Sequence, residues 1–243
     1  MGVQIPPGAE GRWIRHAQRK IRAGHVRIMK TLLRNQKQAV AILKQLRLCY
    51  PNSKTELVYH NPFQLLVAVI LSAQCTDKRV NLVTPDLFKR YPTPEAMAQA
   101  DLPQLEKAIY SCGYYRAKAK ALKNMSQTLV SEYRRQVPTT LEELVRLPGV
   151  GRKTASVIMN QAFGQPAIAV DTHVARLSRR LGWSCHTSAE KIEEDLRTLF
   201  PKSAWIDING TLILHGRAIC KARKPLCAQC CLADLCPSVQ DLS

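Results

Sequence analysis

Residues 147–153 read Leu147-Pro148-Gly149-Val150-Gly151-Arg152-Lys153 and lie between two stretches with a helical pattern. Pro148 cannot continue a helix, and Gly149 and Gly151 accept backbone angles that other residues avoid. Helical periodicity resumes from Thr154 to Phe163, with Ala155, Ile158, Met159 and Ala162 on one side. The sequence therefore predicts a helix, a tight turn and a second helix.

A turn of this kind can bind a phosphate group. The amides of the turn and the N-terminus of the second helix point outward and carry partial positive charge, which attracts an anion without reading a base sequence. Arg152 adds a full positive charge at the same place. We therefore predict a contact with a nucleic-acid phosphate, made by Gly149, Val150, Gly151 and Arg152. A plain turn without a ligand is the alternative.

The charge of the chain points to the same class of partner. Lysine and arginine number 36 and aspartate and glutamate 18, which gives a net charge of +18 in 243 residues. Residues 1–35 hold eight basic side chains and one acidic one, so most of the surplus lies in the body of the chain. A polyanion is thus the expected partner, with nucleic acid ahead of an anionic membrane surface.

The apolar runs and the cysteines of the sequence limit the cellular compartments that can be expected for the protein. No apolar run approaches the roughly 20 residues that a membrane span needs, and the first residues lack the apolar segment of a secretory signal. The nine cysteines are an odd number, and five fall within residues 220–236, which argues against a secreted disulfide framework. We expect a monomer with no membrane partner: cytoplasmic, at the nucleoid, in a bacterium, and nuclear or mitochondrial in a eukaryote.

Helical signals run through the chain, and no segment alternates with the period of a strand. One helix is expected over residues 35–48, and a buried helix over the apolar residues 63–71. Further helix starts are predicted at Thr93-Pro94, Asp101-Leu102-Pro103, Thr140-Leu141 and Ser188-Ala189. The fold class is therefore all-α, preceded by a basic, flexible extension over residues 1–34.

Lys153 and Asp171 are candidates for chemistry. Lys153 stands in the first turn of the second hairpin helix, where a cation is unusual because the helix N-terminus is itself partly positive. That repulsion favours a free amine, which can attack a sugar carbon and form a Schiff base; a phosphate contact is the alternative role. Asp171 follows the apolar run 167–170 and can cap the next helix. Its carboxylate can also accept the proton of a lysine or stabilise positive charge on a sugar.

A metal-binding pattern near the C-terminus consists of Cys220, Cys227, Cys230 and Cys236. Thiolates are the ligands of zinc and of iron–sulfur clusters, and the composition of this segment does not choose between them. Disulfides are a further alternative, and Cys231 is an extra thiol outside the pattern. A short basic loop between the first two cysteines is predicted to face a phosphate backbone, and its cations are Lys221, Arg223 and Lys224.

These features together resemble the endonuclease III family of base-excision DNA glycosylases. The resemblance covers about four-fifths of the chain, from about Leu43 to Cys236. It is carried by the segments Leu71–Asp77, Leu147–Ala155, Ile168–His173 and Leu212–Arg217, and by the stretch Gly164-Gln165-Pro166 ahead of Asp171. The spacing of the four cysteines also matches the [4Fe–4S] loop of that family.

The resemblance implies a fold of two helical lobes, with a helix–hairpin–helix and a C-terminal iron–sulfur loop. A central domain of residues 55–165 would carry the hairpin, and residues 35–54 and 166–243 would form the cluster domain. Lys153 and Asp171 would be the catalytic pair, and the four cysteines would hold a [4Fe–4S] cluster. Gln74 would fill the gap that a flipped-out base leaves, and Tyr114 would be a second such wedge, although leucine is common at that position in the family.

The implied function is that of a bifunctional DNA glycosylase and abasic-site lyase of base excision repair, acting on double-stranded DNA with a damaged base or an abasic site. The amine of Lys153 would attack C1′, displace an oxidised pyrimidine and cut the strand 3′ to the lesion by β-elimination. Adenine glycosylases are monofunctional, lack the hairpin lysine and have a glutamate where this chain has Ala68. A monofunctional enzyme and a non-enzymatic, redox-sensing DNA-binding protein are the two alternatives.

Overall fold

The computed structural model describes residues 36–53 and 55–239, and every regular element among them is a helix. The predicted all-α class is therefore confirmed. The predicted basic extension over residues 1–34 lies outside the described residues. The helix expected over residues 35–48 is found over 36–49.

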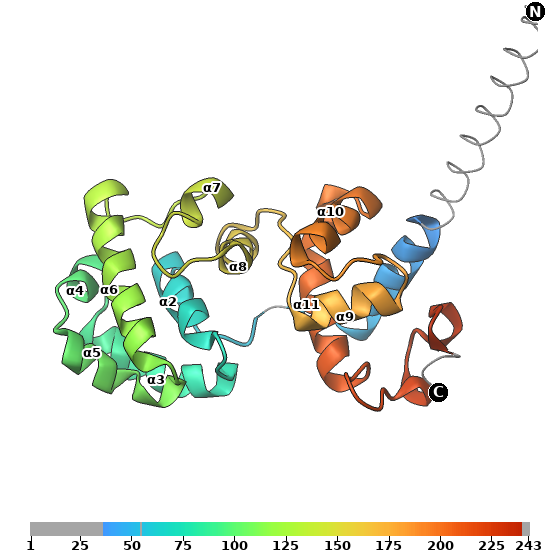
Figure 1. The fold of residues 1–243 in the computed structure, drawn as a ribbon, viewed down its shortest axis with the longest axis horizontal. Coiled ribbons are helices and arrows are strands. Elements are labelled where there is room, and N and C mark those ends of the chain that lie inside the picture. The colour runs from blue at the N-terminus through green and yellow to red at the C-terminus, as the bar shows by residue number, and fades with distance from the viewer. Residues whose placement is uncertain (1–35, 54, 240–243) are drawn as a thin grey trace, which may run out of the picture.

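The first lobe is built around α2 (Pro62–Ser72), the apolar helix that the sequence predicts to be buried. Its apolar residues from Phe63 to Leu71 are buried all round the helix, so neighbours cover it on every side. Helices α3, α6 and α8 pack directly against it (Figure 1). The elements of this lobe are α2, α3 (Asp77–Arg90), α4 (Pro94–Ala98), α5 (Leu102–Ala108), η1 (Tyr110–Cys112), α6 (Tyr115–Glu132), α7 (Leu141–Leu144) and α8 (Arg152–Phe163).

The predicted helix starts are confirmed by side-chain caps. In each case the side chain of the residue before the helix accepts a hydrogen bond from an amide of the first turn, which satisfies a donor that has no partner inside the helix. The helices α4, α5, α7 and α10 (Ala189–Leu199) begin after the capping residues Thr93, Asp101, Thr140 and Ser188.

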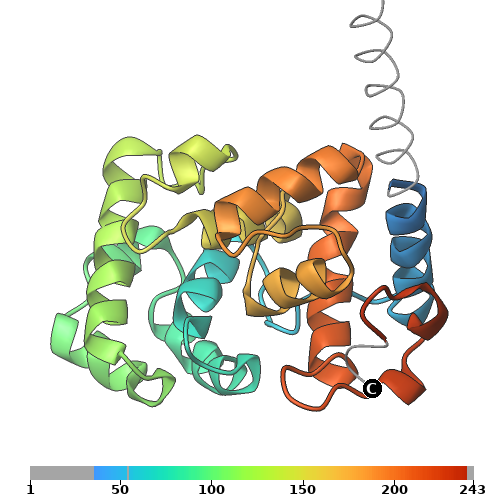
Figure 2. The same ribbon diagram turned by 45° about the vertical axis from the view of Figure 1, so that its right-hand side comes forward.

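The second lobe combines the two ends of the described chain. The helix over 36–49 buries Ala39, Ile42, Leu43 and Leu46 in the same cluster as residues of the C-terminal half. Figures 1 and 2 both show this helix beside the C-terminal segment. The other elements are α9 (Thr172–Arg180), α10, η2 (Lys202–Ala204), α11 (Trp205–Ala218), η3 (Cys227–Gln229) and η4 (Ala233–Leu235).

Two connections join the lobes. One runs from Tyr50 to α2 and passes so close to α11 that a side chain at Gly210 would collide with the carbonyl of Ser53. The other runs from α8 to α9, and its residues change from one core to the other between Ala167 and Ile168. We propose domain boundaries near these connections, which places residues 55–165 in a central domain and 35–54 with 166–243 in the second. Within the described residues, no helix has both the length and the apolar character that a membrane crossing requires.

Candidate active site

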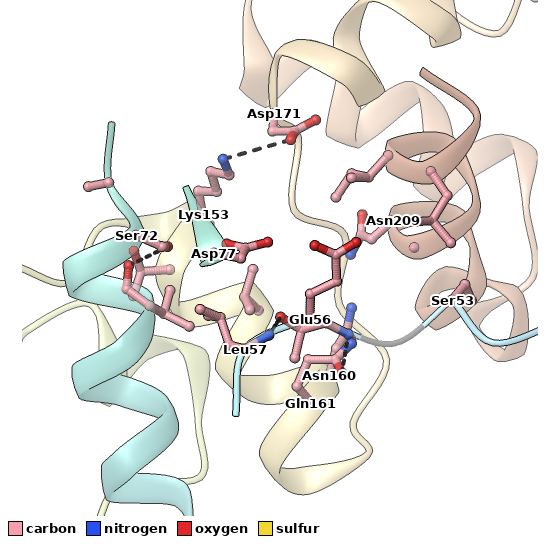
Figure 3. A pocket seen from close by; sticks show the side chains of 18 of the residues that line it. Ser53, Glu56, Leu57, Ser72, Asp77, Lys153, Asn160, Gln161, Asp171 and Asn209 are labelled. Carbon is pink, nitrogen blue, oxygen red and sulfur yellow. Dashed lines mark hydrogen bonds and ion pairs between the residues drawn. The ribbon is translucent and has the colours of Figure 1, made fainter. Parts of the chain in front are cut away.

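Lys153 and Asp171 face each other across the gap between the lobes. The Nζ atom of Lys153 lies 3.9 Å from Oδ2 of Asp171, and Figure 3 shows the two side chains reaching toward each other. The lysine side chain is 59% exposed, whereas the aspartate side chain is 12% exposed. Asp171 caps α9 as predicted, because its Oδ1 accepts the amide hydrogen of Val174 at 2.8 Å. One oxygen of the carboxylate is thus held by the helix, and the other faces the amine.

The side chains of two buried asparagines hold the backbone that leads to Asp171. The Asn160 side chain donates to the carbonyl of Ala167 and accepts from its amide, both at 2.8 Å. The Asn209 side chain donates to the same carbonyl at 3.2 Å and accepts from the amide of Ala169 at 3.0 Å. Asn160 belongs to α8 and Asn209 to α11, so both lobes hold the segment in place. The sequence patterns did not identify either residue.

A cavity of about 270 Å³ opens beside the pair and is lined from both lobes. Its size suits a ligand smaller than a typical drug molecule. Gln74, Lys153 and Asp171 all line it, as do the acidic Glu56 and Asp77 (Figure 3). Arg217 of α11 forms ion pairs with Glu56 at 3.5 Å and with Asp77 at 3.4 Å. Asp77 and Arg217 lie in segments that carry the resemblance, but their place in the cavity depends on the fold.

The hairpin turn has the predicted glycine geometry. Gly149 has φ +78°, and a Cβ atom there would lie 2.8 Å from Cβ of Ala121 on α6. Within the described residues, the amides of Gly149 and Gly151 donate no hydrogen bond, which leaves them available to an anion. Val150 differs, because its side chain is buried and its amide donates to the carbonyl of Leu147 at 3.0 Å. The predicted phosphate contact therefore rests on the two glycines more than on Val150.

Arg152, which we predicted to contact phosphate, is already paired within the protein. Its Nε and Nη2 donate to the two carboxylate oxygens of Glu193 on α10, each at 2.8 Å. These hydrogen bonds raise the pKa of Arg152. The Glu193 side chain is 8% exposed, so its charge needs this partner. The pair links the hairpin helix to the second lobe, and the sequence patterns did not identify Glu193.

The predicted wedge residues lie close to the hairpin. Gln74 and Tyr114 have φ +52° and +47°, a left-handed conformation that is uncommon for residues with large side chains. Both are exposed, Tyr114 to 68%. Both line a second, shallow cavity together with Gly149. The fold thus brings together three segments that the sequence predicts to touch DNA.

The four predicted cysteine ligands line one apolar cavity of the second lobe, together with Arg180 and His215. Among residues 36–53 and 55–239, no three metal-binding side chains lie close enough to share a single ion. The four thiols line one cavity, and this donor set fits an iron–sulfur cluster as well as a zinc ion. Donors already face the sulfurs: Arg180 donates to Sγ of Cys220 at 3.3 Å, and the amide of Leu232 donates to Sγ of Cys230 at 3.4 Å.

The basic loop after Cys220 is exposed and anchored by Arg180. The guanidinium of Arg180 donates to the carbonyls of Lys221 and Ala222 at 2.8 and 3.1 Å. All three predicted cations, Lys221, Arg223 and Lys224, are exposed. Arg180 therefore connects the loop to the cysteine cavity, a link that the sequence patterns did not reveal.

Comparison with known proteins agrees with this geometry. Residues 67–202 match the family model described as HhH-GPD superfamily base excision DNA repair protein. An endonuclease III of Synechocystis is 48% identical over 214 residues, which cover 88% of this chain and 98% of that protein. One of Bacillus subtilis is 47% identical over 204 residues, which cover 80% and 92%. The chain belongs to the endonuclease III family.

Two solved structures and a second family model also support this family assignment. A trapped endonuclease III–DNA covalent intermediate and a non-covalent endonuclease III–DNA complex each match with a TM-score of 0.81 and 43% identity, over 85% of this chain and 97% of the solved chain. The iron–sulfur binding domain of endonuclease III matches residues 220–236, from the first to the fourth cysteine of the predicted pattern. This match decides between zinc and iron: the cofactor of this endonuclease III family member is a [4Fe–4S] cluster.

Proposed function

We propose that this protein removes damaged bases from double-stranded DNA and cuts the strand at the resulting site, with Lys153 as the nucleophile and Asp171 as its acid–base partner. The proposal rests on the 3.9 Å distance between Nζ of Lys153 and Oδ2 of Asp171, beside a cavity that residues of both lobes line. The endonuclease III relatives and the trapped covalent complex of one of them support a bifunctional glycosylase and lyase of base excision repair.

The chemistry follows from the positions of the two side chains. The unprotonated amine of Lys153 attacks C1′ while the bond from C1′ to the base breaks, and the base leaves with that electron pair. Asp171 takes a proton from the nitrogen and passes it to the ring oxygen of the sugar, and the ring opens to a protonated imine. Loss of a proton from C2′ then expels the 3′ phosphate, and water hydrolyses the imine to restore Lys153.

DNA is held by contacts to its backbone and by insertion at the lesion. The free amides of Gly149 and Gly151 bind one phosphate, and the exposed basic loop of Lys221, Arg223 and Lys224 faces another part of the backbone. Gln74 and Tyr114 enter the space that the flipped nucleotide leaves. The guanidinium of Arg152 has a smaller part in this binding, because Glu193 holds it.

The substrate class is oxidised pyrimidines. A cavity of about 270 Å³ fits one nucleobase, and its walls include both hydrogen-bond donors and acceptors among apolar side chains. Arg217 can donate to base oxygens, and the carboxylates of Glu56 and Asp77 can accept from ring N–H groups. An oxidised pyrimidine has more polar groups than thymine, so these walls favour it over the normal base.

The cluster is held by Cys220, Cys227, Cys230 and Cys236, which share one cavity. Burial raises the pKa of the Cys230 and Cys236 thiols, so bound iron is needed to keep them as thiolates. The cluster shapes the basic loop that Arg180 anchors.

The protein acts at the nucleoid, because the relatives with high sequence identity are bacterial.

The test is borohydride trapping on a duplex that contains thymine glycol, with the wild type and Lys153→Ala in parallel. We expect a covalent adduct with the wild type and none with the variant, because only an amine nucleophile leaves a reducible imine. Base release without an adduct would support a monofunctional glycosylase. Neither release nor adduct, from protein that binds DNA with its cluster intact, would support a DNA-binding protein without this activity.

A further inference from the structure

Lys118 is a buried cation that is held by backbone carbonyls. Its side chain lies in the first turn of α6, and the residue is 6% exposed. Its Nζ donates to the carbonyls of Leu71 and Cys112, both at 2.8 Å. None of the ion pairs in the described part of the chain includes Lys118. Burial of an ammonium group without a carboxylate is costly, and here two carbonyl dipoles compensate for it.

The two carbonyls belong to the two loops that carry the wedge residues. Leu71 lies in the last turn of α2, shortly before Gln74. Cys112 is the last residue of η1, shortly before Tyr114. Each wedge residue has a left-handed backbone, a conformation that persists only where the surrounding structure holds it. A single ammonium group therefore fixes the backbone ahead of both strained residues.

The same helix also meets the hairpin. Ala121, one turn after Lys118, packs against Gly149 so closely that a Cβ atom there would lie 2.8 Å away. Gln74, Tyr114, Lys118, Ala121 and Gly149 line one shallow cavity. The start of α6 is thus a common support for both wedge loops and for the proposed phosphate-binding turn.

We propose that Lys118 is a positioning residue that couples the two wedges, so that Gln74 and Tyr114 enter the DNA duplex as one unit. The proposal rests on the proposed function, because that function assigns the wedge roles. Lys118 does not touch the reacting atoms. Its effect is on the step in which the damaged nucleotide leaves the stack, and that step matters most when the lesion is paired.

Lys123 provides a matched control on the same helix. Its Nζ also donates to a backbone carbonyl at 2.8 Å, but that carbonyl belongs to Ala100, which lies between α4 and α5 and in neither wedge loop. Loss of either lysine removes a charged hydrogen bond to a loop. Only the loss of Lys118 releases the wedges.

The experiment compares the wild type, Lys118→Met and Lys123→Met on thymine glycol in a fully paired duplex and in an unpaired bubble. We expect Lys118→Met to slow base release from the duplex by about tenfold or more, and from the bubble by less than about threefold. Lys123→Met should change both rates alike. Equal losses on the two substrates for Lys118→Met would overturn the proposal, because a role in stability alone lowers both.

Two further measurements keep the proposal testable if Lys118→Met folds poorly or the chemistry is absent. In the wild-type background, Gln74→Ala and Tyr114→Ala should be strongly non-additive in duplex activity, since coupled wedges fail together; additive losses would refute the coupling. Fluorescence of 2-aminopurine opposite a stable abasic-site analogue reports wedge insertion without catalysis. Wedge insertion measured in this way should be lower for Lys118→Gln than for the wild type, and unchanged for Lys123→Gln. Strand cutting at a natural abasic site by the wild type tests the proposed function separately.

Discussion

The guanidinium of Arg152 forms two 2.8 Å hydrogen bonds to the carboxylate of Glu193, across the boundary between the lobes. Arg152 directly precedes Lys153 in α8, and Glu193 lies in α10 of the lobe that carries Asp171. The pair therefore helps to fix the distance between Lys153 and Asp171. The pairing thus directs the arginine next to Lys153 toward the second lobe.

Arg152→Met should destabilise the protein by about 1–3 kcal/mol, near the lower value because the guanidinium is half exposed. Chemical denaturation measures this loss. Glu193→Gln should be destabilising as well, and the double variant should lose less than the sum of the two. If Arg152 instead serves DNA, its replacement would leave stability unchanged and reduce the salt dependence of DNA affinity by about one phosphate contact.

Replacement of Asp171 can separate its two roles. Asp171→Asn keeps a good helix cap but loses the charge, so base release should fall about 10²–10⁴-fold while the free energy of unfolding changes by less than about 0.5 kcal/mol. Asp171→Ala should lose activity to the same degree and also about 1 kcal/mol of stability. Single-turnover rates and denaturation curves give both values. An active Asp171→Asn enzyme would remove the carboxylate from the mechanism.

The two neighbouring thiols Cys230 and Cys231 offer a matched test of the cluster ligands. Cys230 lines the cysteine cavity and Cys231 does not. Cys230→Ser should lose the visible absorbance of the iron–sulfur cluster, whereas Cys231→Ser should keep it. Loss of the cluster should weaken DNA binding by about tenfold or more, because the basic loop loses its support. Unchanged DNA affinity in Cys220→Ser without a cluster would show that the cluster does not shape this loop.

Acid should destabilise the fold through His173. Burial lowers the pKa of this imidazole, with Arg176 and Arg217 adding to the effect and Asp171 opposing it. The unfolded state then binds more protons between the lowered pKa and the usual value near 6.5, so stability is highest above about pH 6.5 and falls as the pH drops below it. His173→Asn retains an acceptor for the 3.2 Å contact with Arg176 and should reduce this acid dependence. Identical pH–stability curves for wild type and variant would exclude His173 as the cause.

Much of the local structure could be predicted from the sequence. The hairpin between 147 and 153 depends on Pro148 and the glycines, whose backbone limits act within a few residues. The capping residues Thr93, Asp101, Thr140 and Ser188 mark helix starts for the same reason, because each satisfies an amide of the first turn that follows it. The apolar run 63–71 predicts a buried helix because it offers no polar face to water.

The relations between distant residues required the tertiary structure. From the sequence, Arg152 was predicted to contact phosphate, because nothing in the sequence distinguishes Glu193 from the other acidic residues of α10. Packing of the lobes brings Arg152 and Glu193 together. Asn160 and Asn209, which hold the backbone before Asp171, could likewise be identified only from the structure. In the sequence Lys118 is one of several basic residues of a helix, and only the structure shows that its ammonium group lies between two carbonyls. The sequence by itself determined the elements and the chemical character of the site, because those depend on neighbours along the chain. Only the tertiary structure decided which charges are free for DNA, because that depends on which partners the packing brings within hydrogen-bonding distance.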